Sequence, residues 1–215
     1  MKSLLLKDLY NISHNAKSML FILAMIALII VPTSGAPTYT ISCSILCAMM
    51  IMTTFTFDEA SGWTAYALIL PVTRRVVVRA KYAALAVFCT AGSLFGLAVS
   101  ALVSLCAVGR MTELNSPLVL LAMLPVGWAV AFAMGSMAIP LAYKYGAEHA
   151  RVLLFAAFMA PAMLVIAVIG VMAVLEVSLS GAAVTALVCA SPLAALAWGY
   201  VMYRAACRVF EKKEV

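Results

Sequence analysis

The chain has 215 residues, of which 67% are hydrophobic and 10% are charged, and its formal net charge at pH 7 is +6. This composition excludes a soluble globular protein, which needs far more polar surface, and predicts an all-α polytopic membrane protein in a single transmembrane domain (1–215). The excess of cations does not indicate nucleic-acid binding, because the cations lie at the ends of apolar spans.

The N-terminal segment, residues 3–18, has the pattern of an amphipathic helix that lies in the headgroup plane. Its apolar stripe consists of Leu5, Leu9, Ile12 and Ala16. The opposite face carries Lys7, Asn11, His14 and Ser18. Six apolar segments follow, each near the ~20 residues that a helix needs to cross a bilayer. We place these spans at about 18–32, 40–57, 80–108, 118–142, 152–174 and 182–203. The third is long enough to project from the membrane, and we expect it to do so on the cytoplasmic side.

The distribution of cations predicts the orientation of the spans. If both termini are cytoplasmic, 13 of the 14 Lys and Arg residues lie in inner segments, and Arg110 is the one cation in an outer loop. Inner loops of membrane proteins carry such an excess of positive charge. The loop at 58–79 is therefore expected to be cytoplasmic.

This first inner loop, with the residues that border it, is the longest gap between apolar spans. It opens with the acids Asp58 and Glu59, and a run with helical spacing follows. The residues that share one face of this expected helix are Trp63, Tyr66, Ala67 and Leu70. Pro71 ends the helix, because proline lacks a backbone donor and restricts the preceding residue. Four cations come next, Arg74, Arg75, Arg79 and Lys81. A short helix of this kind is either bound by a protein outside the bilayer or rests on the headgroups, and the pattern leaves both readings open.

Small residues recur at four-residue spacing within three of the spans. They are Gly92, Gly96, Ser100 and Ser104; Gly127, Ala131 and Gly135; and Ser191, Ala195 and Gly199. Small side chains let helix backbones approach closely in lipid, where no hydrophobic effect drives helices together. We favour packing within the chain over a subunit interface for each stripe.

The spans lack the residues of catalysis or ion coupling. No charged residue or histidine lies in a span interior, and no H-E-x-x-H zinc motif or G-x-x-x-x-G-K-[ST] phosphate-binding motif is present. The cysteines form no CxxC pair and have no histidine at metal-ligand spacing. We therefore expect no enzymatic activity, no metal and no ATP site in this chain.

The second span has a mildly polar face that fits a substrate pathway. Ser42, Met49, Thr53 and Thr56 share this face, and the fifth span offers Phe155, Phe158, Met159 and Met163 around Pro161. Methionine adapts its shape to varied amphipathic molecules. The alternative is that the hydroxyl groups bond to carbonyls of their own helix and the methionines fill packing gaps.

The layout resembles the ABC type-2 permeases, and above all the small permeases of bacterial exporters of phenol-soluble modulins and antimicrobial peptides. The resemblance spans the chain and is most specific in the loop, which reads F-D-E…W…Y…L-P-V-T-R-R…K-Y. It implies that the loop is a coupling helix docked on a separate ATPase, which binds ATP and Mg²⁺. Asp58 and Glu59 would face cations of that ATPase. Trp63, Tyr66, Leu70 and Pro71 would supply the apolar part of the interface, and Arg74, Arg75, Arg79 and Lys81 would hold the loop at the anionic leaflet.

The same resemblance implies two permease and two ATPase subunits in a bacterial plasma membrane, with the pathway between the second and fifth spans of two permeases. The permeases would be two identical chains or this chain and a close paralogue. The short outer loop from Leu175 to Gly181 departs from larger permeases and leaves little room for an outer gate. Two other functions fit the pattern less fully: a substrate-capture subunit of an energy-coupled importer, and an assembly factor without transport activity.

Overall fold

The computed structural model describes residues 2–63, 66–67, 73–106, 117–174 and 181–212, which are almost entirely helical and contain no strand. The main helices are α1 (Lys2–Ser34), α2 (Ala36–Ala60), α4 (Arg74–Cys106), α5 (Pro117–Val174) and α6 (Gly181–Lys212). Within the described residues, five helical stretches are long and apolar enough to cross a membrane: Lys17–Ser34, Ala36–Ala60, Arg74–Val103, Val119–Gly146 and Thr185–Glu211. The all-α membrane fold is therefore confirmed.

These five stretches correspond to the first, second, third, fourth and sixth expected spans. Residues 152–174, the expected fifth span, are helical as the last part of α5. The total of six spans stays a prediction.

The N-terminal helix differs from the expectation in its length. The interfacial helix expected at 3–18 and the span expected at 18–32 form one continuous helix, α1. The sequence offers a reason, because neither glycine nor proline occurs before Pro32, so nothing breaks the helical hydrogen bonding. Gly35, with φ of 86°, then turns the chain directly into α2.

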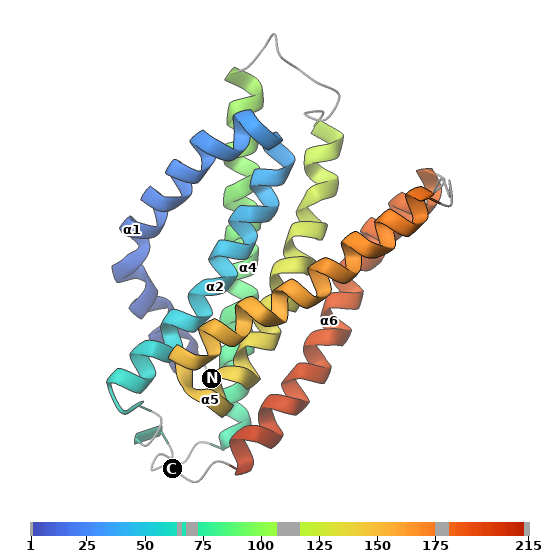
Figure 1. The fold of residues 1–215 in the computed structure, drawn as a ribbon. Helices are drawn as coiled ribbons and strands as arrows, with labels where there is room; N and C mark the ends of the chain where they lie inside the picture. The colour runs from blue at the N-terminus through green and yellow to red at the C-terminus, as the bar shows by residue number, and fades with distance from the viewer. Residues whose placement is uncertain (1, 64–65, 68–72, 107–116, 175–180, 213–215) are drawn as a thin grey trace.

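Helix α2 is the centre of the bundle and contacts α1, α4 and α5 (Figure 1). Its buried residues include Tyr39, Cys43, Ile51 and Phe55. Helix α4 begins at Arg74, six residues before the span expected from the sequence, and its 33 residues reach ~50 Å at ~1.5 Å each. It is therefore longer than the hydrocarbon core, as we expected.

The glycine stripes pack within the chain. A Cβ atom on Gly92 would lie 2.5 Å from the Cβ of Cys47, and one on Gly96 would lie 3.0 Å from the Cα of Thr40. A Cβ on Gly199 of α6 would lie 2.5 Å from the Phe132 ring of α5. These helices approach too closely for any larger residue, which confirms the prediction for these glycines.

Helix α5 is divided at Gly146, where φ is 81° and ψ is 166°. The sequence predicts a loop at about 143–151, but helical geometry is interrupted only at this one glycine. After it, α5 runs obliquely to the other helices towards the start of α6 (Figure 1).

Candidate functional site

The candidate coupling segment begins where α2 ends. The Ser61 hydroxyl donates a hydrogen bond to the Phe57 carbonyl oxygen over 2.7 Å, and Gly62, with φ of 63°, turns the chain. Trp63, Tyr66 and Ala67 are helical, as the sequence pattern predicts. Leu70 and Pro71 lie outside the described residues, so the extent of this helix stays a prediction.

The two aromatic residues of the segment lie together. The ring centroids of Trp63 and Tyr66 are 5.6 Å apart. Tyr66 is 57% exposed, Trp63 is partly exposed, and Ala67 is buried against the bundle. The segment therefore presents an aromatic pair at the surface while its small residue faces inward.

Asp58 does not have the exposed side chain that the expected contact with cations of an ATPase needs. Its side chain is only 8% exposed, and its two carboxylate oxygens meet two lysines of this chain. Lys7 Nζ lies 2.5 Å from one oxygen and Lys81 Nζ lies 2.6 Å from the other. Within this chain, Asp58 is an internal ion-pair partner.

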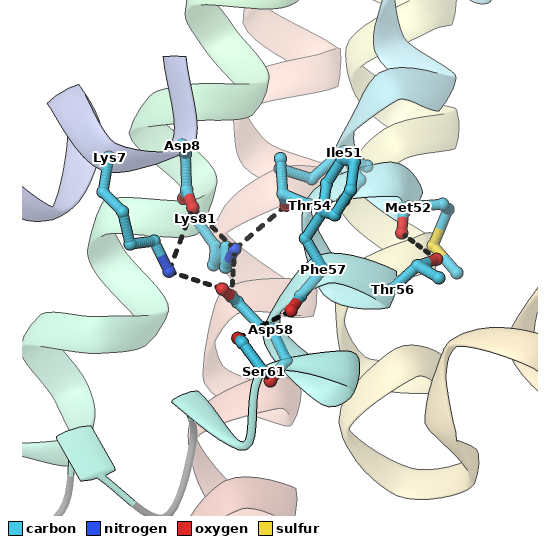
Figure 2. Close-up of polar contacts among 10 residues, drawn as sticks. All are labelled: Lys7, Asp8, Ile51, Met52, Thr54, Thr56, Phe57, Asp58, Ser61 and Lys81. Atoms are coloured by element: carbon cyan, nitrogen blue, oxygen red, sulfur yellow. Dashed lines mark hydrogen bonds and ion pairs between the residues drawn. The ribbon is translucent and has the colours of Figure 1, made fainter. Parts of the chain in front are cut away.

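Lys81 also departs from the expectation, since we had placed it among the membrane-surface cations. Its side chain is 5% exposed, and its ammonium donates to Asp8 over 3.0 Å and to the Thr54 hydroxyl over 2.9 Å, besides its contact with Asp58. Lys7 completes the group with a 3.4 Å contact to Asp8. Lys7, Asp8, Asp58 and Lys81 thus form a closed ring of alternating charges, which we call the charge ring (Figure 2).

The charge ring is connected to the aromatic pair. Lys7 Nζ lies 4.4 Å from the centroid of the Trp63 ring, and Lys81 Nζ lies 4.9 Å from that of Phe55. A cation over an aromatic face is attracted by the ring quadrupole. Lys7 therefore contacts both a buried carboxylate and the aromatic residue expected to bind a partner.

Glu59 is exposed, unlike its neighbour Asp58. A Cβ atom on Gly146 would lie 3.2 Å from Glu59 Oε1, so the carboxylate is next to the kink in α5. The end of α2 thus contacts the point at which α5 changes direction.

The remaining loop cations occupy different environments. Arg74 donates to the carbonyl oxygens of Phe210 and Glu211, each over 2.9 Å, near the end of α6. Arg75 pairs with Glu211 over 2.9 Å with 72% of its side chain exposed, and Arg79 is exposed. Arg75 and Arg79 have the exposure that a headgroup contact needs, whereas Arg74 stabilises the last carbonyls of α6.

The second-span residues of the candidate pathway share the less buried face of α2, where Ser42, Met49, Thr53 and Thr56 are all partly exposed. Ser42 donates to the Thr38 carbonyl over 3.0 Å and Thr56 to the Met52 carbonyl over 3.1 Å, as the alternative reading anticipated. Met49, Met52 and Met134 line a small cavity between α2 and α5. The fifth-span candidates Phe155, Phe158, Met159 and Met163 lie on helical backbone of α5, and their side chains are outside the described part of the chain.

Sequence reasoning missed Asp8 and Thr54, and it placed Lys7 on the wet face of the N-terminal helix. A signal for Asp8 was present: it is the only acidic residue before Asp58 and lies at i+3 from Leu5 and i−4 from Ile12 on the apolar stripe. An acid on an apolar helix face needs a cationic partner when it is buried.

Comparison with protein families gives one match. Residues 3–211 match the family described as ABC-2 family transporter protein. Comparisons with the curated proteins and with the solved structures found no match. Proteins of this family are membrane permeases without an ATPase site of their own, and they pair with an ABC ATPase subunit. With nearly its whole length matched, the chain belongs to the ABC-2 transporter family.

Proposed function

We propose that this chain is the permease subunit of an ATP-driven exporter that moves amphipathic peptides or similar amphiphiles out of a bacterial cell. A separate ATPase binds ATP and Mg²⁺ and supplies the energy. The observation that carries the proposal is the aromatic pair of Trp63 and Tyr66, which is presented at the surface directly after α2. Aromatic residues dominate the binding energy of many protein interfaces.

In this proposal the segment around Trp63 is the coupling helix. Trp63 and Tyr66 enter a groove of the ATPase, and Glu59, which lies at the same turn, faces cations at its edge. Closure of two ATPase subunits on ATP then moves the segment, and the spans follow as rigid bodies. Arg75 and Arg79 hold the region at the anionic leaflet.

The proposed pathway runs along the partly exposed face of α2, between two copies of the permease or between this chain and a paralogue. Support comes from the partial exposure of Ser42, Met49, Thr53 and Thr56, which share this mildly polar face. Such a surface suits amphiphiles of varied shape. The first turns of α1 and the last turn of α6 contact the region around the loop, so these parts share one side of the bundle, which we propose is cytoplasmic.

Co-expression tests the function. A neighbouring gene that encodes a phosphate-binding ATPase motif would be expressed with this chain, and the complex purified through a tag on the permease. We expect a stoichiometric complex whose ATP hydrolysis in lipid vesicles rises when amphipathic peptides are added. A permease that purifies alone would overturn the proposal, and nanomolar binding of a small molecule to that isolated chain would favour the importer subunit instead.

A further inference from the structure

We propose that the charge ring is a clamp that makes α1 part of the coupling apparatus, with Lys7 as the residue that positions Trp63. This inference rests on the proposed function, in which Trp63 contacts the ATPase. It assigns roles to Lys7, Asp8 and Lys81 that neither the family match nor the sequence pattern provides.

The first argument is the closure of the charge ring. Each lysine contacts both aspartates, so two positive and two negative charges alternate around it. The members come from three helices, α1, α2 and α4 (Figure 2), and the α1 pair is about 50 residues or more from the other two members along the chain. The charge ring therefore ties together the N-terminal helix and the two helices that flank the coupling segment.

The second argument is that the buried members of the charge ring have hydrogen-bond partners for their polar atoms. A lysine ammonium has three N–H donors. For Lys81, three acceptors lie within 3.0 Å, namely Asp8, Asp58 and Thr54. The side chains of Asp8, Asp58 and Lys81 are 2%, 8% and 5% exposed, so water cannot readily replace a lost partner. Such contacts hold helices at fixed relative positions.

The third argument is that Lys7 connects this group to the coupling segment. Its side chain is 23% exposed, the most of the four, and its ammonium lies between the Asp58 carboxylate and the Trp63 ring. A displacement of Trp63 therefore acts on Lys7 and Asp58 together, and through Lys81 on α4. The clamp conveys motion of the coupling segment to α1 and α4 at once.

The first experiment measures the position of Trp63 without any ATPase. Trp63 would be the only tryptophan after Trp128→Phe and Trp198→Phe, and its emission and acrylamide quenching would be measured in lipid vesicles. We expect Lys7→Met to expose Trp63 and raise its quenching. Lys17→Met is the matched control, since Lys17 is an exposed lysine of the same helix. Equal quenching in the Lys7→Met and parent proteins would overturn the positioning role.

The second experiment measures coupling in the complex. The maximal permease-stimulated hydrolysis rate, at saturating ATPase and per bound complex, should fall several-fold in Lys7→Met and Asp8→Asn. The rate should be largely retained in Lys7→Arg and Lys17→Met. Asp8→Asn should leave the affinity for the ATPase unchanged. A merely structural role would lower the amount of folded complex but not the rate per complex.

The outcomes separate the two proposals. If the unmodified permease neither binds nor stimulates the ATPase, the proposed function fails, and the quenching comparison alone decides whether Lys7 positions Trp63. If the unmodified permease stimulates the ATPase and both Lys7→Met and Asp8→Asn match it, the clamp is overturned while the proposed function stands.

Discussion

The ammonium of Lys81 shows why a charge is tolerated deep within this bundle. Its three contacts replace the hydration that burial removes, and the two aspartates balance the two lysines. Removing one partner from a buried charge group leaves the others uncompensated, which typically costs about 3–5 kcal/mol. We predict that Lys81→Met lowers the free energy of unfolding by about this amount, measured by denaturant titration in detergent micelles.

An exposed ion pair offers the matched control. Arg75 and Glu211 are 2.9 Å apart, but their side chains are 72% and 43% exposed. Solvent screens such pairs, which contribute about 0–1 kcal/mol. Glu211→Gln should therefore leave the unfolding transition nearly unchanged, and an equally small effect of Lys81→Met would mean that the charge ring adds no stability.

The helical spacing of apolar residues made the local structure of the coupling segment predictable from the sequence. The spacing of Trp63, Tyr66 and Ala67 indicates a helical segment, and all three residues are helical in the structure. The partners of Asp58 and Lys81 were not predictable, because a pattern along one helix contains no information on which residue faces it from another. A loop rich in cations therefore suggested a surface role for a lysine that is buried.

At the scale of helices, glycine allows α4 to approach α2 closely. A methyl group on Gly92 would lie 2.5 Å from Cys47 Cβ and 3.1 Å from the Cys43 carbonyl oxygen. Alanine favours a helix over glycine by about 1 kcal/mol, but overpacking a close contact costs about 1–3 kcal/mol. We predict a net destabilisation for Gly92→Ala, measured by the same denaturant titration.

Gly181→Ala is the control for this substitution, because a methyl group on Gly181 would meet nothing within 4 Å. Gly181 is the first residue of α6, where the preference for alanine is weaker than in a helix interior, so stability should stay nearly unchanged. Destabilisation of the same size in both variants would contradict close packing at Gly92 as the cause.

The kink in α5 gives a second prediction for an element. Gly146 adopts φ of 81° and ψ of 166°, a region almost restricted to glycine, and an added Cβ would lie 3.2 Å from Glu59 Oε1. Strain of this kind costs about 1–3 kcal/mol. Gly146→Ala should therefore destabilise the fold and shift the second half of α5, which distance measurements between spin labels on α2 and on the end of α5 would detect. Unchanged distances and stability would show that the kink tolerates a side chain.

The helices themselves were largely predictable, because apolar length identifies a span. Their ends were less so. Nothing in the sequence between residues 3 and 31 stops a helix, and α1 accordingly runs through the expected boundary at about residue 18. Conversely, a polar stretch at 143–151 suggested a loop where one glycine is enough to redirect the chain.

For the whole molecule, the proposed function predicts that the loss of Trp63 impairs coupling to the ATPase without unfolding the bundle. Trp63 is partly exposed and lies outside the two hydrophobic core clusters of the described residues. Trp63→Ala should therefore leave the bundle folded but abolish most of the ATP hydrolysis that the permease stimulates in its partner. Size-exclusion chromatography and circular dichroism would verify folding, and hydrolysis would be measured in lipid vesicles.

Trp198→Ala is the control for the loss of a tryptophan. Trp198 is 44% exposed on α6, away from the coupling segment in sequence, and its removal should leave stimulation intact. Full stimulation in Trp63→Ala would remove this residue from the interface and direct attention to Tyr66 and Glu59.

The order of the charge ring along the chain has a consequence for biosynthesis. Lys7 and Asp8 leave the ribosome early, but Lys81 follows Asp8 by 73 residues. At ~5–20 residues per second, this interval is about 4–15 s. During that time Lys7, at 3.4 Å in the finished fold, is the one member of the charge ring that can balance Asp8. Synthesis of α4 therefore completes the attachment of α1, and a nascent chain arrested before residue 81 would lack the shorter of the two ion pairs of Asp8.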